Sequence, residues 1–100
     1  MRELRLTASA KADVSSAFGW YEERQVGLGE SFSLSVHALL STISRRPDGF
    51  PAVDDRFRRA VLRRFPFVVV YEFDAQQVIV NALFHTSQNP SNLRGPLRDT

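Results

Sequence analysis

The sequence contains no cysteine, and this absence excludes disulfide bonds, thiolate metal sites and cysteine nucleophiles. It has no apolar run approaching the roughly 20 residues that span a bilayer, and its N-terminus lacks the apolar stretch of a signal peptide. No glycine-rich phosphate loop, metal-ligand spacing or Ser-His-Asp arrangement is present either. We therefore expect a cytoplasmic protein that makes no contact with membranes and needs neither a metal nor another cofactor.

Lysine is also scarce. Lys11 is the one lysine among thirteen basic residues, so arginine carries the positive charge, and its planar fork suits phosphate and carboxylate groups. The formal net charge is only +2, but residues 45–64 contain seven arginines against three aspartates. This stretch predicts a positive surface that binds RNA, DNA or an acidic protein segment, or that is simply solvated, and charge alone does not choose among these.

One hundred residues, of which 43% are hydrophobic and eight are phenylalanine, are sufficient for a single core. No internal repeat, low-complexity tract or Gly/Ser linker divides the chain. We therefore expect one domain over residues 1–100. Residues 86–100 are polar and contain Pro90 and Pro96, which indicates an irregular C-terminal segment.

The first half of the chain has the pattern of one strand and two helices. Leu4 and Leu6 alternate with polar residues, which predicts a short strand with one buried face. Apolar residues then recur every three or four positions over residues 10–25 and again over residues 30–45. Glycines separate these two segments and Pro47 follows the second, so we expect an antiparallel helical hairpin.

The second half changes to the alternating pattern of strands, over residues 57–63, 67–73 and 78–85. Short links between them indicate an antiparallel meander, and the dense apolar character of the last two strands places them at the centre of the sheet. The predicted fold is α+β in the order β-α-α-β-β-β, a mostly antiparallel sheet packed on one face by the helical hairpin. The residues expected in the core are Phe18, Tyr21, Phe32, Val36, Leu40, Val69 and Val80.

Four stretches between about residue 10 and residue 94 resemble, in the same order, segments of the RelE/ParE superfamily of toxin-antitoxin toxins. They are Ala10-x-x-Asp13-Val14 with Trp20-Tyr21-Glu22-Glu23; Gly27-Leu28-Gly29-x-x-Phe32 with Val36, Leu40, Ile43 and Pro47; Arg58-x-x-x-Leu62-x-x-Phe65-Pro66-Phe67-x-Val69-x-Tyr71; and Ile79-Val80-x-Ala82-x-x-His85-x-x-x-x-Pro90 followed by Arg94. The last stretch is similar to the ParE-like branch.

This resemblance implies the toxin of a type II toxin-antitoxin system, a growth inhibitor associated with plasmid stabilization and neutralised by a co-encoded antitoxin. The ParE branch implies binding to a target such as DNA gyrase. The RelE branch implies cleavage of mRNA on the ribosome, and a degenerate member would bind only its antitoxin. In each case operator DNA would be contacted only through the antitoxin complex. Residues 86–89 lack the basic side chains of the RNase branch, which favours the gyrase alternative and leaves open whether the chain is an enzyme.

The candidate site residues follow from these alternatives. His85 is the acid or base that an RNase would use, because imidazole titrates near neutral pH; otherwise it is a strand-end residue that hydrogen-bonds the following segment. Trp20 lies beside Tyr21 and belongs either to a partner surface or to the edge of the core. The arginines expected to bind a target, a nucleic acid or the antitoxin are Arg56, Arg58, Arg59, Arg63, Arg64 and Arg94.

Overall fold

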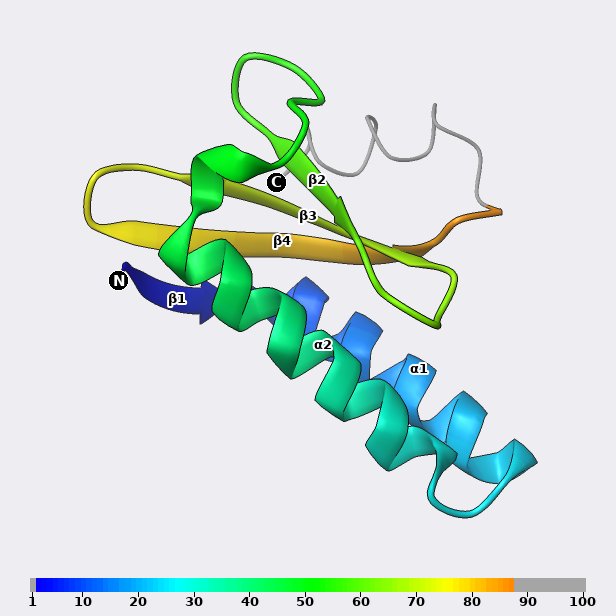
Figure 1. The fold of residues 1–100 in the computed structure, drawn as a ribbon. Helices are drawn as coiled ribbons and strands as arrows, with labels where there is room; N and C mark the ends of the chain where they lie inside the picture. The colour runs from blue at the N-terminus through cyan, green and yellow to red at the C-terminus, as the bar shows by residue number, and fades with distance from the viewer. Residues whose placement is uncertain (1, 88–100) are drawn as a thin grey trace.

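The structure, a computed structural model, describes residues 2–87 and consists of a helical hairpin on one face of a four-stranded sheet (Figure 1). Helix α1 spans Ala8–Arg24 and helix α2 spans Leu28–Arg45. The Thr7 hydroxyl caps α1 by accepting a hydrogen bond from the Ala10 N–H at 3.1 Å. Both helices begin two residues earlier than the apolar periodicity predicts, because capping and turn residues lie outside that periodicity.

A tight turn joins the helices. Gly27 adopts φ +92°, in the left-handed region that favours glycine, and the Glu22 carboxylate accepts hydrogen bonds from the N–H groups of Gly27 and Gly29 at 3.0–3.2 Å. The glycines therefore separate the helices as predicted. Glu22 is explained by this turn, where it satisfies backbone donors at the start of α2.

The sheet consists of β1 (Glu3–Leu6), β2 (Arg58–Val61), β3 (Phe67–Phe73) and β4 (Gln77–His85), in the spatial order β1-β4-β3-β2. The last three strands form the predicted antiparallel meander, with β3 and β4 at the centre. Strand β1 pairs with β4 in parallel, an arrangement that the sequence did not indicate. β2 is shorter than the predicted strand over residues 57–63, and Arg64, at φ +72°, lies in the turn that follows it.

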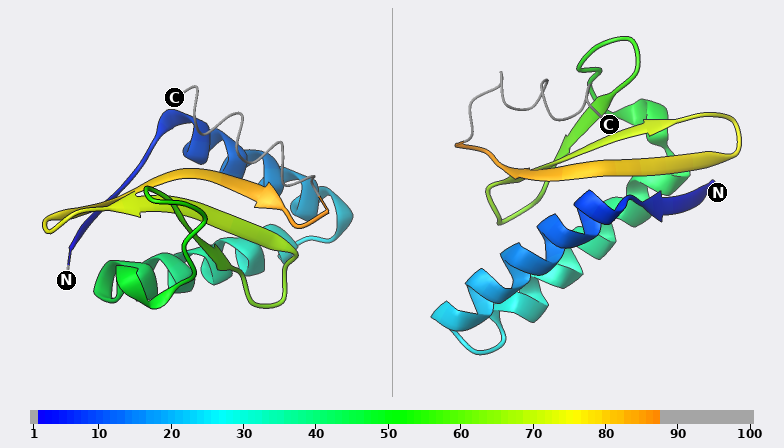
Figure 2. Two further views of the ribbon diagram at one scale, coloured as in Figure 1. Left: turned by 90° about the horizontal axis from the view of Figure 1, so that it is seen from above. Right: turned by 180° about the vertical axis from the view of Figure 1, so that it is seen from behind.

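The core lies between the helices and the sheet (Figure 2). Tyr21, Phe32, Val36, Val69 and Val80 are buried as predicted. The predicted burial of Phe18 and Leu40 is wrong.

Phe18 is 39% exposed, and Leu40 is only half-buried. Phe18 is exposed because the buried stripe of α1 passes through Ala10, Ala17 and Tyr21, and Phe18 is rotated by about 100° from Ala17. Leu40 packs against the core from its edge.

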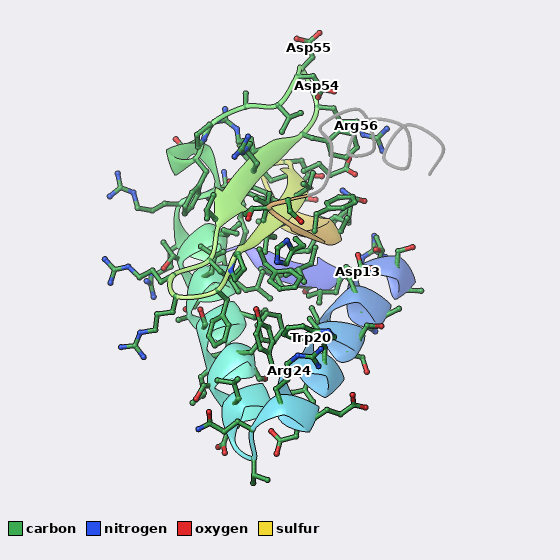
Figure 3. The ribbon with its side chains drawn as sticks, turned by 90° about the vertical axis from the view of Figure 1, so that its right-hand side faces the viewer. Asp13, Trp20, Arg24, Asp54, Asp55 and Arg56 are labelled. Atoms are coloured by element: carbon green, nitrogen blue, oxygen red, sulfur yellow. The ribbon has the colours of Figure 1, made fainter. Side chains whose placement is uncertain are left out.

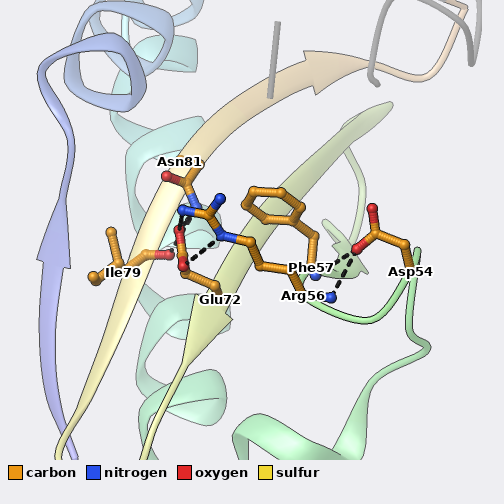
Figure 4. A network of polar contacts seen from close by, with 6 residues as sticks. All are labelled: Asp54, Arg56, Phe57, Glu72, Ile79 and Asn81. Carbon is orange, nitrogen blue, oxygen red and sulfur yellow. Dashed lines mark hydrogen bonds and ion pairs between the residues drawn. The ribbon is translucent and has the colours of Figure 1, made fainter. Parts of the chain in front are cut away.

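A smaller cluster occupies the opposite face of the sheet, where Phe57, Val68, Val70 and Ala82 are buried together. Next to it, the Arg56 guanidinium pairs with the Glu72 carboxylate at 3.0 Å, and the Asn81 amide also donates to that carboxylate at 2.9 Å (Figure 4). Asn81 lies at an irregularity in the pairing of β3 with β4. A bulge of this kind redirects side chains, and here it accompanies a polar network on the sheet surface.

Candidate functional site

Two hollows flank the helical hairpin. The first, called here the α2–β2 groove, has a volume of about 640 Å³ and lies between α2 and the edge strand β2. Its lining residues are Ser31, Leu34, Ser35, Ala38, Leu39, Thr42, Phe50, Val61, Arg63 and Arg64.

Leu34 and Val61 in this groove are 63% and 51% exposed, which is high for aliphatic side chains. The groove therefore combines an apolar floor with a positive border.

The border of the α2–β2 groove is anchored to α2. The Ser35 hydroxyl donates a hydrogen bond of 2.9 Å to the Arg63 carbonyl and so holds the turn after β2 against the helix. Arg63 and Arg64 are both exposed at this turn. The outer side of β2 is already partly paired, because Arg58 forms a bridge with Ala52 and the Arg59 N–H donates to the Pro51 carbonyl at 3.0 Å. The Val61 end of this edge strand lies next to the apolar floor.

The remaining predicted arginines lie elsewhere. Arg56 pairs with Glu72, whose hydrogen bond and charge raise the pKa of Arg56. Arg58 donates to the carbonyls of Asp48 at 3.2 Å and Phe50 at 2.6 Å, so its guanidinium holds the loop before β2. Arg59 is exposed, and Arg94 lies outside the described residues.

Of the five predicted arginines within residues 2–87, Arg63 and Arg64 lie together at the α2–β2 groove.

The second hollow, called here the α1–β4 pocket, has a volume of about 470 Å³. It is lined by Asp13, Ser16, Ala17, Trp20, Tyr21, Phe67, Leu83, His85 and Ser87. Figure 3 shows Asp13, Trp20 and Arg24 in order along α1, with Arg56 at the far end of the molecule. No lysine or arginine of residues 2–87 lines this pocket.

Asp13 connects the two walls of the pocket. Its Oδ2 accepts a hydrogen bond of 3.0 Å from the Leu83 N–H, beyond the point where β1 stops pairing with β4. Burial raises the pKa of the Asp13 carboxyl, although the hydrogen bond from Leu83 acts in the opposite direction. Trp20 follows Asp13 by seven positions, so two helical turns bring both side chains to one face of α1.

His85 lies exposed at the end of β4, with its ring edge-on to Phe67 at 5.2 Å. Its Nδ1 accepts a hydrogen bond of 3.1 Å from the Ser87 N–H, so a neutral ring carries its proton on Nε2. The structure therefore places His85 in a local contact with the segment after the strand. His85 thus lines the α1–β4 pocket, whereas Arg63 and Arg64 line the α2–β2 groove.

Asp13 is not among the site residues predicted from the sequence. Its helical spacing from Trp20 was visible, but the Leu83 N–H that it contacts is 70 residues away. Within residues 2–87, no three His, Cys, Asp or Glu side chains gather as a possible metal site. No helix in that part of the chain is both long and apolar enough to cross a membrane.

Comparisons with known proteins agree with this fold. The family model described as "ParE toxin of type II toxin-antitoxin system, parDE" matches residues 4–90. Toxin ParE2 of Mycobacterium tuberculosis, strains H37Rv and CDC 1551, is 25% identical over 91 residues, which cover 90% of this chain and 87% of the relative.

A chain of the solved structure "Chromosomal ParDE TA system from P. aeruginosa" superposes with a TM-score of 0.76 at 15% identity, over 87% of this chain and 98% of that chain. This likeness supports the two-helix, four-stranded fold. Because the family match extends over most of the chain, from the first strand to beyond the last, the chain belongs to the ParE toxin family of type II toxin-antitoxin systems.

Proposed function

We propose that this chain inhibits growth, and that a co-encoded antitoxin neutralises it by occupying the α2–β2 groove. The observation that carries the proposal is the exposure of Leu34 and Val61 in a hollow bordered by Arg63 and Arg64. Apolar contacts on the groove floor supply affinity, while the arginines favour a segment with acidic residues. Family membership supplies the reason to expect an antitoxin.

The edge position of β2 gives this groove a second means of recognition. An extended segment laid beside the Val61 end of β2 would form main-chain hydrogen bonds there, beyond the part of the edge that Ala52 already pairs with, and would place alternate side chains over Leu34 and Val61. A helical segment would instead fill the groove with one apolar face. Both modes require the acidic groups of the partner to reach Arg63 and Arg64.

The test compares two double charge reversals in adjacent arginines. Arg63→Glu with Arg64→Glu reverses the groove border, whereas Arg45→Glu with Arg46→Glu reverses two exposed arginines that do not line the groove. At low salt, the first variant should associate with the antitoxin about tenfold more slowly than the second, because attraction between opposite charges accelerates encounter. Rising salt should reduce this difference. Equal association rates for the two variants would contradict the proposal.

We infer that the target is a protein such as DNA gyrase, and that the toxin does not cleave mRNA. His85 lies in a pocket that no described lysine or arginine lines, whereas RNA cleavage requires cations around the reacting phosphate. Expression without antitoxin should stop DNA synthesis before protein synthesis in pulse-labelled cells, and His85→Ala should remain toxic. Early arrest of protein synthesis with cleaved mRNA, abolished by His85→Ala, would instead favour the RNase alternative. Unimpaired growth would indicate a non-toxic member.

A further inference from the structure

The α1–β4 pocket joins aromatic rings with a carboxylate. Trp20, Tyr21 and Phe67 contribute three rings to its lining, and Asp13 contributes the negative charge. Trp20 is 51% exposed and meets Tyr21 edge-on at 5.1 Å, so a large part of the indole is accessible from solvent. Binding at the α2–β2 groove uses none of these residues.

Asp13 lacks a cationic partner within residues 2–87. Its one hydrogen bond among these residues is the contact from the Leu83 N–H to Oδ2. The carboxylate is half-buried, and its desolvation is reflected in its raised pKa. Removing a carboxylate from water costs free energy unless a cation compensates. A cationic group that entered the pocket would therefore compensate the Asp13 carboxylate.

The aromatic rings favour the same ligand charge. The face of an indole attracts cations because its quadrupole is negative there. The Trp20 ring already attracts one cation of the protein, because the guanidinium carbon of Arg24 lies 3.3 Å from the ring centroid (Figure 3). Arg24 does not line the pocket, and it leaves Asp13 without an ion pair.

We propose that the α1–β4 pocket binds the guanidinium of an arginine side chain presented by a protein partner. Guanidinium is planar, stacks on aromatic faces and donates a two-pronged pair of hydrogen bonds to a carboxylate, whereas the ammonium of lysine is a compact, strongly hydrated charge. The Ser16 hydroxyl lines the same hollow and offers a further acceptor. A volume of about 470 Å³ is within the range of small-ligand pockets and accommodates one long side chain.

This pocket is separate from the α2–β2 groove. The strand order β1-β4-β3-β2 puts β4 and β2 on opposite sides of β3, and each helix borders one hollow. The groove attracts acidic segments and the pocket attracts a basic side chain. Two partners of opposite charge can therefore be bound at once.

Binding can be measured by the fluorescence of Trp20, because Trp20 is the only tryptophan of the chain and lines the pocket. Titration with N-acetyl-arginine amide should change its fluorescence in a saturable manner at millimolar concentrations. N-acetyl-citrulline amide, which has nearly the same shape without the charge, should have little effect, and N-acetyl-lysine amide should bind more weakly than the arginine compound. The Leu83 amide resonance should shift in the same titration, because its N–H contacts Asp13.

Two substitutions on α1 make the test specific. Asp13→Asn should weaken arginine binding at least tenfold, whereas Glu23→Gln removes the same charge from an exposed position outside the pocket and should leave binding unchanged. Asp13→Asn should also be at least as heat-stable as the parent protein at neutral pH, because the amide removes the cost of a desolvated carboxylate. A merely structural Asp13 would give the opposite stability result.

Four outcomes would overturn the proposal. These are no saturable change with the arginine compound, equal binding of the citrulline or lysine compound, unaltered binding in Asp13→Asn, and a clear loss of stability in that variant. An arginine of this chain itself is the alternative occupant. Arg94 and Arg98 lie outside the described residues, and the double variant Arg94→Gln with Arg98→Gln tests this alternative. If this double variant bound the arginine compound tenfold more tightly, the arginine would come from the chain itself and the partner assignment would be wrong.

Discussion

Tyr71→Phe removes one oxygen atom from the centre of the protein. The Tyr71 side chain is fully buried, and its hydroxyl donates a hydrogen bond to the Pro47 carbonyl, which is itself buried at the end of α2. This bond connects β3 to the turn that ends the helical hairpin. Burial raises the pKa of Tyr71 from 10.0 to about 12, because the charged form is poorly solvated there.

The substitution leaves the Pro47 carbonyl without its partner in a place that water does not reach. Loss of one partner from a buried polar group costs about 1–3 kcal/mol of unfolding free energy. For a chain of this size, each kcal/mol lowers the melting temperature by about 4–8 °C. We therefore expect Tyr71→Phe to melt at least about 4 °C below the parent protein.

Tyr21→Phe is the matched control, because it makes the same chemical change in a tyrosine whose hydroxyl has no hydrogen-bond partner within residues 2–87. Its unfolding free energy should change by less than about 0.5 kcal/mol in chemical denaturation. Tyr71 should also stabilise the fold fully below pH 10, and this contribution should disappear as pH rises through about 12. Equal stabilities of the two variants at neutral pH would refute the reasoning.

Three further predictions concern the fold. Phe32→Ala should cost about 3–5 kcal/mol because the ring is fully buried, whereas half-buried Leu40→Ala should cost about 1 kcal/mol, both measured by urea denaturation. Gly27→Ala should lower stability by about 1–2 kcal/mol through the left-handed backbone alone, since nothing lies within 4 Å of the added methyl group. Asp74→Ala should destabilise at neutral pH by removing hydrogen bonds from two turn N–H groups that lower the Asp74 pKa. Its difference from the parent should vanish as pH falls through that lowered pKa, below 3.8.

Much of the fold could be predicted from the sequence because the two halves have different apolar periods. The helical hairpin, the antiparallel meander and the central position of β3 and β4 all follow from local patterns and short links. The parallel pairing of β1 with β4 could not be predicted, because no local pattern specifies which strand a four-residue segment joins. The exposure of Phe18 could not be predicted, because Phe18 follows Val14 by four positions and therefore fits the same apolar periodicity as the buried residues of α1.

The candidate sites were predicted less completely. Arg56, Arg58 and Arg63 lie close together in the sequence and were therefore predicted to form one positive surface. In the fold they lie apart, because alternate residues of a strand point to opposite faces of the sheet and the loops beside the strand change the direction of the chain. Arg56 and Arg58 consequently satisfy partners within the fold. The α1–β4 pocket depends on the contact of Asp13 with Leu83, and no sequence pattern reports a contact between such distant residues.

The parallel pairing of β1 with β4 also determines when this protein can fold during its synthesis. The pairing joins Glu3 to Gln77, so β1 cannot pair with β4 until β4 has emerged from the ribosome. Contacts over such long separations slow folding and leave apolar strands uncovered in the meantime. A chain interrupted between the end of α2 and residue 77 contains both helices but lacks the partner strand of β1. Translation that stops early therefore produces fragments that cannot complete the four-stranded sheet.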